Sequence, residues 1–264
     1  MKTRVISAIL MLCVLIPVLF VNSTIPIIIV GLIASAIAGF EYARMAKVNK
    51  CTTILFSIVG YYSLVANVHT PKVAEILAPS YLILVSFLST VIYLILRDRD
   101  LKELYGNLVS LIYIGFGVGS IVVLKTIDTR VLVYLAIVIA TTDTFAYIFG
   151  VNFGKHKLAP TISPKKSIEG SVAGVIFATV FGALYIYFSG MLTEFPNILV
   201  NIYIAVILTI IVSIVGQIGD LFASKVKRTY NVKDFGTIFP GHGGVLDRFD
   251  SLILGAMVLF ILFL

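Results

Sequence analysis

Four aspartates lie in parts of this sequence that are otherwise apolar. They are Asp143, Asp220, Asp247 and Asp250, and each falls inside a hydrophobic segment or at its edge. A carboxylate in a membrane segment costs several kcal/mol unless it meets a cation, a metal ion or water, so function is the default hypothesis. For the remaining acids, which fall in expected loops or near expected helix ends, a solvated charge is the simplest interpretation: Glu41, Glu75, Asp98, Asp100, Glu103, Asp128, Glu169, Glu194 and Asp234.

Asp220 belongs to a polar stripe. Ser213, Gln217, Asp220 and Ser224 are spaced by four, three and four residues, which places them on one face of a helix. Such a stripe must face protein or a water-filled cavity, not lipid. A hydrogen-bonded seam between helices would explain the serines and the glutamine, but it explains the aspartate poorly. We therefore expect this face to carry function.

Asp143 precedes a lysine-rich connection. It lies late in an apolar segment, with Tyr147 one helical turn further on. The connection 151–170 then contains Ser163 and four lysines, Lys155, Lys157, Lys165 and Lys166. Any one of these lysines is explained by a position in a cytoplasmic loop. As a group beside buried aspartates, their ammonium groups suit a substrate that carries several phosphates.

A glycine-rich turn opens the last apolar segment. In PGHGG (240–244), Gly241, Gly243 and Gly244 surround His242, and a helix is predicted to begin directly afterwards. Turns of this kind let successive backbone N–H groups point at one anion, and the dipole of the following helix adds to the attraction. For His242, the roles of phosphate donor, general acid or base, and simple turn residue all remain open.

The helix after this turn carries two acids on one face. Asp247 and Asp250 are three residues apart, whereas Arg248 projects elsewhere. Carboxylates in a low-dielectric site favour a divalent metal ion, and phosphates favour both metal ions and basic side chains. These residues predict a magnesium-dependent phosphoryl- or nucleotidyl-transfer site built in the membrane, with a lipid substrate that enters sideways.

Membrane helices must position these residues. The chain is 59% hydrophobic and 12% charged, with a mean hydropathy of +1.08, values that indicate a membrane protein and not a soluble domain. We predict an all-α polytopic membrane protein with about nine transmembrane helices. Residues 1–130 would hold about five helices whose sequence says little about function. Residues 131–264 would hold the catalytic region. The predicted helices are approximately 5–21, 24–43, 52–67, 78–96, 108–124, 131–150, 171–190, 197–222 and 246–264.

The basic residues separate by side of the membrane when these helices are numbered alternately. Of the 20 lysines and arginines, one side holds only Lys72, Lys125 and Arg130. The positive-inside rule then places the N-terminus in the cytoplasm and the C-terminus outside, with the connections 151–170 and 223–245 facing the cytoplasm. The net charge of +7 follows from these loops, so we do not expect a nucleic-acid partner.

Sequence blocks in the C-terminal half resemble the phosphatidate cytidylyltransferase (CDP-diacylglycerol synthase) family. SKVKRTYNVKDFGTIFPGHGGVLDRFDS looks like its signature, and TDTFAYIFG, FGKHKLAP and SPKKSIEGS look like two further conserved blocks. The resemblance covers roughly 141–251. One departure is Ile168, where the family usually has an aromatic residue before the glutamate; a stacking or packing role there is in doubt, not the chemistry. The signature residues matched are Ser224, Arg228, Lys233, Asp234, Pro240, Gly241, His242, Gly243, Gly244, Asp247, Arg248 and Asp250.

The resemblance implies that CTP and phosphatidic acid react to give CDP-diacylglycerol and pyrophosphate. It also implies two bound metal ions, of which Mg²⁺ is one, a homodimer, and an active site that faces the cytoplasm from the inner membrane. Catalytic roles are then expected for Asp220, Asp247, Lys165, Arg248 and His242, and metal ligation for Asp220, Asp247, Asp143 and Asp250. Substrate contacts are expected from Lys166, Ser163, Ser224, Lys225, Arg228, Lys233, Gly241, Gly243 and Gly244.

Three other classes of protein also use buried acids. A related CTP-dependent lipid kinase would share the donor site and differ only in the lipid acceptor. An ion-coupled transporter would place its polar groups near the bilayer midplane and show repeat symmetry, whereas these polar groups crowd the cytoplasmic end. An intramembrane aspartyl protease would need glycine where Gln217 stands. The complete signature favours the cytidylyltransferase.

Overall fold

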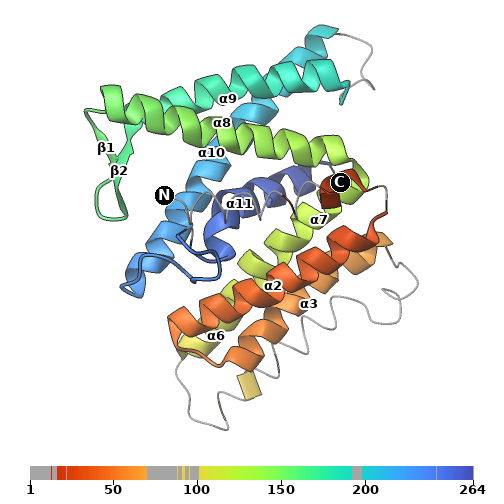
Figure 1. The fold of residues 1–264 in the computed structure, drawn as a ribbon, viewed down its shortest axis with the longest axis vertical. Coiled ribbons are helices and arrows are strands. Elements are labelled where there is room, and N and C mark those ends of the chain that lie inside the picture. The colour runs from red at the N-terminus through yellow and green to blue at the C-terminus, as the bar shows by residue number, and fades with distance from the viewer. Residues whose placement is uncertain are drawn as a thin grey trace. The chain divides into compact units, whose positions relative to one another are not determined.

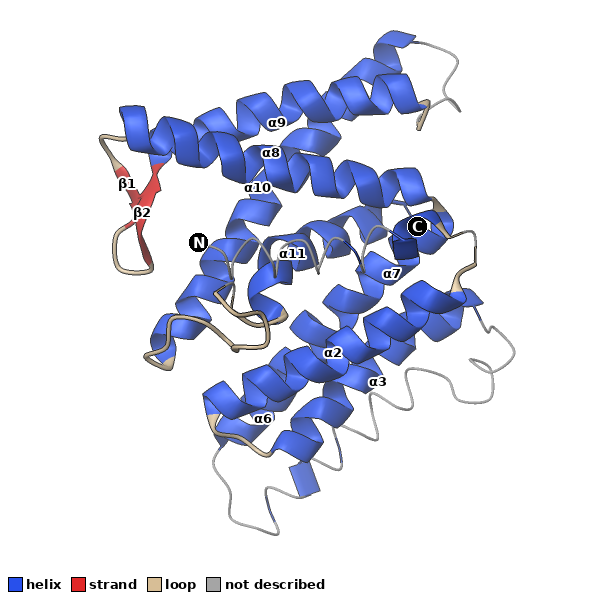
Figure 2. Ribbon diagram, in the orientation of Figure 1, coloured by secondary structure: helices blue, strands red, loops and turns tan. Residues whose placement is uncertain are grey.

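The computed structural model describes residues 17–21, 23–69, 101–191, 198–241 and 243–263, together with Cys13 and positions 88, 91, 92 and 95. Most of these residues are helical, and one short hairpin interrupts the helices (Figure 1, Figure 2). The elements are α2 (Ile25–Ala46), α3 (Lys50–His69), α6 (Leu101–Val109), the π-helix η1 (Ser110–Phe116), α7 (Gly117–Ile127), α8 (Thr129–Phe153), β1 (Lys157–Ala159), β2 (Ser163–Ser167), α9 (Ile168–Ser189), α10 (Ile198–Thr229) and α11 (Leu246–Phe263).

The chain is a multi-pass helical membrane protein. Among the described residues, five helical stretches are long and apolar enough to cross a membrane: Ile25–Ala46, Leu101–Ile127, Thr129–Phe153, Ile168–Ser189 and Ile202–Thr229. The predicted segments 5–21 and 78–96 lie largely outside the described residues, and the other predicted segments overlap described helices. Nine spans and the direction of the two termini therefore stay predictions.

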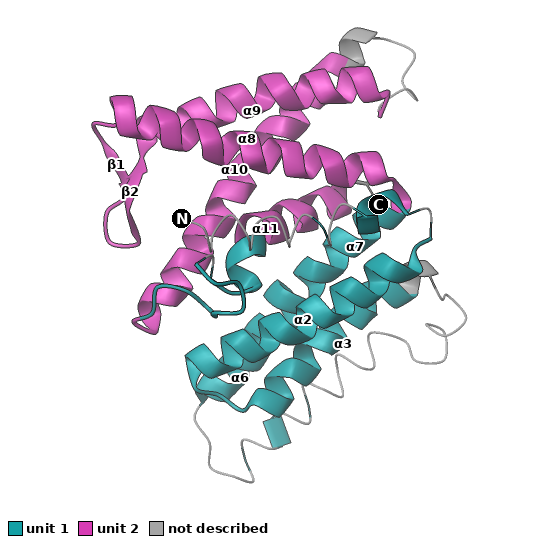
Figure 3. Ribbon diagram, viewed as in Figure 1, with its two compact units in different colours: residues 1–126, 232–249 teal, residues 127–231, 250–264 magenta. Residues whose placement is uncertain are grey.

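The chain divides into two compact units (Figure 3). Unit 1 comprises residues 1–126 and 232–249, and unit 2 comprises 127–231 and 250–264. The segment that carries the glycine-rich turn thus groups with the N-terminal helices, although the sequence places it in the C-terminal half. The boundary between the two units at residues 249 and 250 falls inside α11.

Unit 1 is built from α2, α3 and the stretch α6–η1–α7, which pack against one another. Gly115 of η1 approaches α3 so closely that a Cβ there would lie 2.5 Å from the carbonyl oxygen of Ser57. Buried hydroxyls join the helices: Ser35 Oγ donates to that same carbonyl at 3.0 Å, and Ser110 Oγ donates to the carbonyl of Thr53 at 2.7 Å. Such bonds satisfy polar groups that water cannot reach in a membrane.

Unit 2 is built around α8 and α9, which lie side by side, with α10 packed against both. The rings of Phe145 and Phe177 stack between α8 and α9 with centroids 4.0 Å apart. α10 continues to Thr229, whereas the sequence predicted its end at 222. Lys227 and Arg228 in its last turn complement the helix dipole, which favours this extension.

The connection between α8 and α9 is an antiparallel hairpin, where the sequence predicted a plain loop. Lys157 of β1 lies opposite Ser167 of β2. Ser167 also caps α9, because its Oγ accepts the N–H of Gly170 at 3.2 Å. In the first turn of α9, Glu169 accepts from the backbone N–H of His156 at 3.1 Å and pairs with its Nδ1 at 2.7 Å. Strands of three and five residues carry too little alternation to be recognised from sequence.

Candidate active site

A pocket of about 550 Å³ lies within unit 2. Its walls come from the C-terminal half of α8, the hairpin, the start of α9 and the middle of α10. The lining combines one acid, three lysines, one amide, and small, hydroxyl and apolar residues: Asp143, Ala146, Tyr147, Gly150, Val151, Gly154, Lys157, Lys165, Lys166, Ser167, Ser171 and Gln217.

Gly150 of α8 and Gly154, the residue that follows its last turn, let the hairpin close against this helix. A Cβ at Gly154 would lie 2.6 Å from Ser167 Oγ, and a Cβ at Gly150 would lie 3.0 Å from the same atom. Larger residues would therefore push the end of β2 away from α8. Because Lys165 and Lys166 directly precede Ser167 in β2, this close contact fixes where both lysines enter the pocket.

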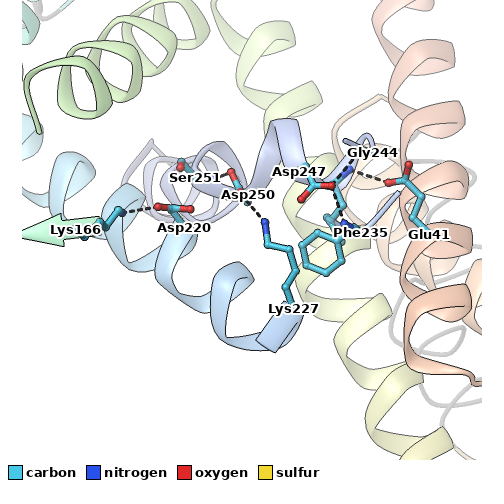
Figure 4. Close-up of polar contacts among 10 residues, drawn as sticks. Glu41, Lys166, Asp220, Lys227, Phe235, Gly244, Asp247, Asp250 and Ser251 are labelled. Carbon is cyan, nitrogen blue, oxygen red and sulfur yellow. Dashed lines mark hydrogen bonds and ion pairs between the residues drawn. The ribbon is translucent and has the colours of Figure 1, made fainter. Parts of the chain in front are cut away.

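Lys166 and Asp220 form the central ion pair of unit 2 (Figure 4). Lys166 Nζ lies 2.5 Å from Asp220 Oδ2, and both side chains are largely withdrawn from solvent. Asp143, from α8, is close enough to interact electrostatically with both groups. The structure therefore brings together two of the four aspartates singled out in the sequence, with Lys166 near both.

The polar stripe on α10 faces protein, as its spacing predicts. Ser213 Oγ lies 2.7 Å from Thr142 Oγ1 of α8. One turn on, the Gln217 side chain accepts from Ser171 Oγ of α9 at 2.5 Å and donates to the Ser171 carbonyl at 3.3 Å. These neutral contacts form the packing seam considered above, whereas Asp220, the next member, meets a charged partner at the pocket. Neutral packing contacts and a charged contact thus occupy successive turns of one helix face.

Asp250 lies near a different lysine. Its Oδ2 is 3.8 Å from Lys227 Nζ, and its Oδ1 accepts the backbone N–H of Ser251 at 2.9 Å (Figure 4). Sequence reasoning counted Lys227 only as a loop charge, because α10 was expected to end before it. The additional helical turn of α10 brings Lys227 toward α11.

Asp247 lies in unit 1 and holds the glycine-rich segment together. The side chain is 8% exposed, and its Oδ2 accepts the backbone N–H groups of Phe235 at 2.8 Å and Gly244 at 2.9 Å. Gly241 and Gly243 have φ values of 79° and 88°, which a residue with a side chain rarely adopts. The turn was expected to offer its N–H groups to a triphosphate, but that of Gly244 is bound by the chain's own carboxylate.

Glu41 is a functional candidate that sequence reasoning missed. It was interpreted as a solvated charge near a helix end, and that interpretation was wrong: α2 continues to Ala46, and Glu41 is 2% exposed. Its Oε1 accepts the N–H of Val245 at 3.0 Å and its Oε2 that of Leu246 at 3.1 Å. The signal was present, because Glu41 lies inside the apolar segment 24–43 like the acids that were singled out.

The other predicted site residues lie on the elements around these two clusters. Ser163 begins β2 and is half-buried. Ser224, half-buried, and the exposed Lys225 and Arg228 lie on the last turns of α10. Lys233 is exposed in the connection to α11 and Arg248 is exposed on α11, while His242 falls outside the described residues.

The donor set in unit 2 fits a hard divalent cation. Asp143 and Asp220 offer carboxylate oxygens, which Mg²⁺ prefers, and this ion is commonly held by one or two carboxylates together with substrate phosphates and water. Within the described part of the chain, no group of three or more His, Cys, Asp and Glu side chains is arranged to hold an ion. The protein would thus supply a partial ligand set that phosphates complete.

Known proteins match this chain over nearly its whole length. The model of the cytidylyltransferase family matches residues 2–264. The phosphatidate cytidylyltransferase of Staphylococcus haemolyticus (strain JCSC1435) is 35% identical over 261 residues, which cover 96% of this chain and 95% of that protein. The proteins of the same name from Staphylococcus aureus (strain COL) and Staphylococcus epidermidis (strain ATCC 12228 / FDA PCI 1200) are each 33% identical, over 255 and 260 residues and with the same coverage of both chains.

Proposed function

This chain belongs to the cytidylyltransferase family, and from that membership we propose that it makes CDP-diacylglycerol and pyrophosphate from CTP and phosphatidic acid. The observation that carries the proposal is the match, over 96% of the chain, to proteins named phosphatidate cytidylyltransferase. The resemblance found in the C-terminal sequence blocks is confirmed by this match, which extends through the N-terminal helices as well.

The proposed reaction is an in-line displacement at phosphorus. A phosphate oxygen of phosphatidic acid attacks the α-phosphorus of CTP, and the bond from that phosphorus to the bridging oxygen breaks as pyrophosphate leaves with the electron pair. The lipid phosphate is already an anionic nucleophile, so no covalent enzyme intermediate is required. Catalysis of this kind consists mainly of positioning and charge neutralisation.

The residues of the unit 2 pocket suit this task. Lys157, Lys165 and Lys166 line it together and would hold phosphate oxygens as point charges. The contact of Lys166 with Asp220 keeps its ammonium group at the pocket before a phosphate arrives. Asp143 and Asp220 would hold a Mg²⁺ ion. Bound there, the ion would neutralise the phosphates and stabilise the departing pyrophosphate.

The remaining parts of the proposal concern the setting of the site. We place it on the cytoplasmic side of the inner membrane, because the lysine-rich connections follow the positive-inside rule and CTP is cytoplasmic. We further propose two metal ions, with Asp247 and Asp250 as the other acidic ligands, and a homodimeric enzyme. Arg248 and His242 would contact the phosphates.

Transfer of label from CTP to lipid tests the reaction. The full-length protein in detergent micelles would receive phosphatidic acid and CTP labelled in the cytosine, with Mg²⁺ present or chelated. We expect cytosine label in the organic phase only when the metal is present. Movement of γ-phosphate label to a lipid alcohol, with the cytosine label left in water, would identify a lipid kinase instead. No transfer of either kind by folded protein would contradict both enzymes.

Lys165→Ala should weaken substrate binding more than it slows chemistry. Lys165 lines the pocket beside Lys166, and loss of one charged hydrogen bond to phosphate corresponds to roughly a tenfold or larger rise in KM. Steady-state kinetics with CTP and phosphatidic acid varied in turn would measure this rise. Lys102→Ala is a matched control, because Lys102 is an exposed lysine of α6 that lies outside the lining of this pocket and is not among the expected site residues. An unchanged KM for both substrates in the Lys165 variant would contradict the role.

A further inference from the structure

We infer that Glu41 is a positioning residue for cytidylyl transfer: its carboxylate fixes the first turn of α11 and, through that turn, the carboxylate of Asp247. The inference rests on the proposed function, in which Asp247 acts on the substrate phosphates or their metal ion. Glu41 comes from α2, 204 positions away from Val245 in the sequence. All of these residues belong to unit 1.

Three successive backbone N–H groups connect the two carboxylates. That of Gly244 donates to Asp247 (Figure 4), and those of Val245 and Leu246 donate to Glu41. The first N–H groups of a helix have no partner within the helix, so Glu41 supplies the partners that this helix start lacks. Because the three groups are consecutive, a shift of the turn at Val245 would also move the N–H that holds Asp247.

Two glycines nearby are explained by the space that Glu41 occupies. A Cβ at Gly236 or at Gly244 would overlap the Glu41 carboxylate. Neither position needs glycine for its backbone, because the described glycines with positive φ are Gly190, Gly241 and Gly243. The segment around the glycine-rich turn is thus shaped to receive a carboxylate from α2.

Helix stability alone does not explain this arrangement. The charges of Glu41 and Asp247 are close enough to interact unfavourably, and a buried acid beside a second acid is costly. Ser, Thr or Asn at the start of α11 would cap the helix without that cost. The presence of Glu41, an acid from α2, at the start of α11 is better explained by the need to hold the turn that binds Asp247 in one place.

Kinetics of Glu41 variants test the inference. The full-length protein in micelles would be assayed with cytosine-labelled CTP and phosphatidic acid, and its melting temperature would be measured in parallel. We expect Glu41→Ala to lower kcat about 100-fold, as misplacement of a reacting group does, with little change in the KM for CTP. Glu41→Gln keeps one acceptor oxygen and should lower kcat less than Glu41→Ala does. Ser35→Ala is the matched control, because Ser35 is a buried hydrogen-bonding residue of the same helix.

Two results would overturn the inference while leaving the proposed function intact. One is a Glu41→Ala enzyme with the kcat of the parent protein at a temperature where both are folded. The other is a lower KM for CTP with unchanged or higher kcat, which would mean that Glu41 occupies an anion site that a substrate phosphate takes over. A parent protein that transfers no cytosine label would instead contradict the proposed function itself.

A double-variant cycle provides a second readout. Gly236→Ala should lower kcat, because its new Cβ meets the Glu41 carboxylate, and it should lower the melting temperature as well. Glu41→Asp shortens the side chain by one carbon and makes room for that Cβ. We expect the double variant to retain more activity and a higher melting temperature than Gly236→Ala alone. Independent losses from the two substitutions would contradict the contact on which the inference depends.

Discussion

Asp220→Asn should reduce kcat by about 100- to 1000-fold, the usual effect of removing one electrostatic group from a transition state. The substitution keeps the size of the side chain and removes its negative charge. Asp220 then no longer pairs with Lys166 in the manner observed at 2.5 Å, and it can no longer act as a carboxylate ligand beside Asp143. Initial rates of cytosine-label transfer at saturating CTP and Mg²⁺ would measure the loss.

The control for this variant is Asp128→Asn. Asp128 caps α8 in the same unit and accepts the N–H of Arg130 at 2.8 Å, but it lies at the opposite end of α8 from the pocket residues Asp143 and Gly150. Asparagine is itself a good helix cap, so this variant should keep both its fold and its turnover. Near-normal turnover in Asp220→Asn, with Mg²⁺ dependence unchanged, would remove Asp220 from the metal site.

Asp247→Asn should also lower kcat, by about 100-fold or more. The variant separates two roles of this residue, its negative charge and its hydrogen bonds to the turn. An asparagine side-chain oxygen can still accept the N–H groups of Phe235 and Gly244, which Asp247 Oδ2 binds at 2.8 and 2.9 Å. The turn is therefore expected to stay in place while the charge is lost. Full activity in this variant would mean that Asp247 is needed only to hold the turn.

Asp247→Ala completes the comparison. It leaves both N–H groups without this acceptor in a buried place, which costs about 1–3 kcal/mol for each unsatisfied group. We expect a clear fall in melting temperature, in addition to the loss of turnover seen with asparagine. If Asp247→Ala and Asp247→Asn lower the melting temperature equally, the hydrogen bonds of Asp247 Oδ2 do not stabilise the glycine-rich segment.

The periodicity of the sequence was sufficient to place the helices that hold the site. Hydropathy located α8, α9, α10 and α11 to within several residues, because a helix in a membrane must be apolar over its length. The polar spacing at Ser213, Gln217 and Asp220 also predicted correctly that this face of α10 meets protein. Both results depend on rules that act within one element.

Element ends were predicted less well, and this changed the interpretation of charged residues. α2 and α10 each run further than hydropathy indicated, because helices can extend beyond the apolar core wherever polar partners or the dipole support them. Glu41 was therefore interpreted as a solvated charge, and Lys227 as one of the basic residues of a cytoplasmic connection. In the structure, Glu41 binds the start of α11 and Lys227 lies near Asp250.

The sequence by itself determined the class of protein, its membrane helices, its family and the aspartates that deserve testing. Only the tertiary structure decided the partners: Lys166 for Asp220, the N–H groups of Phe235 and Gly244 for Asp247, and the start of α11 for Glu41. The physical reason is that hydropathy and helical spacing act within one segment. A contact between residues tens to hundreds of positions apart depends on how closely helices pack and where each one ends.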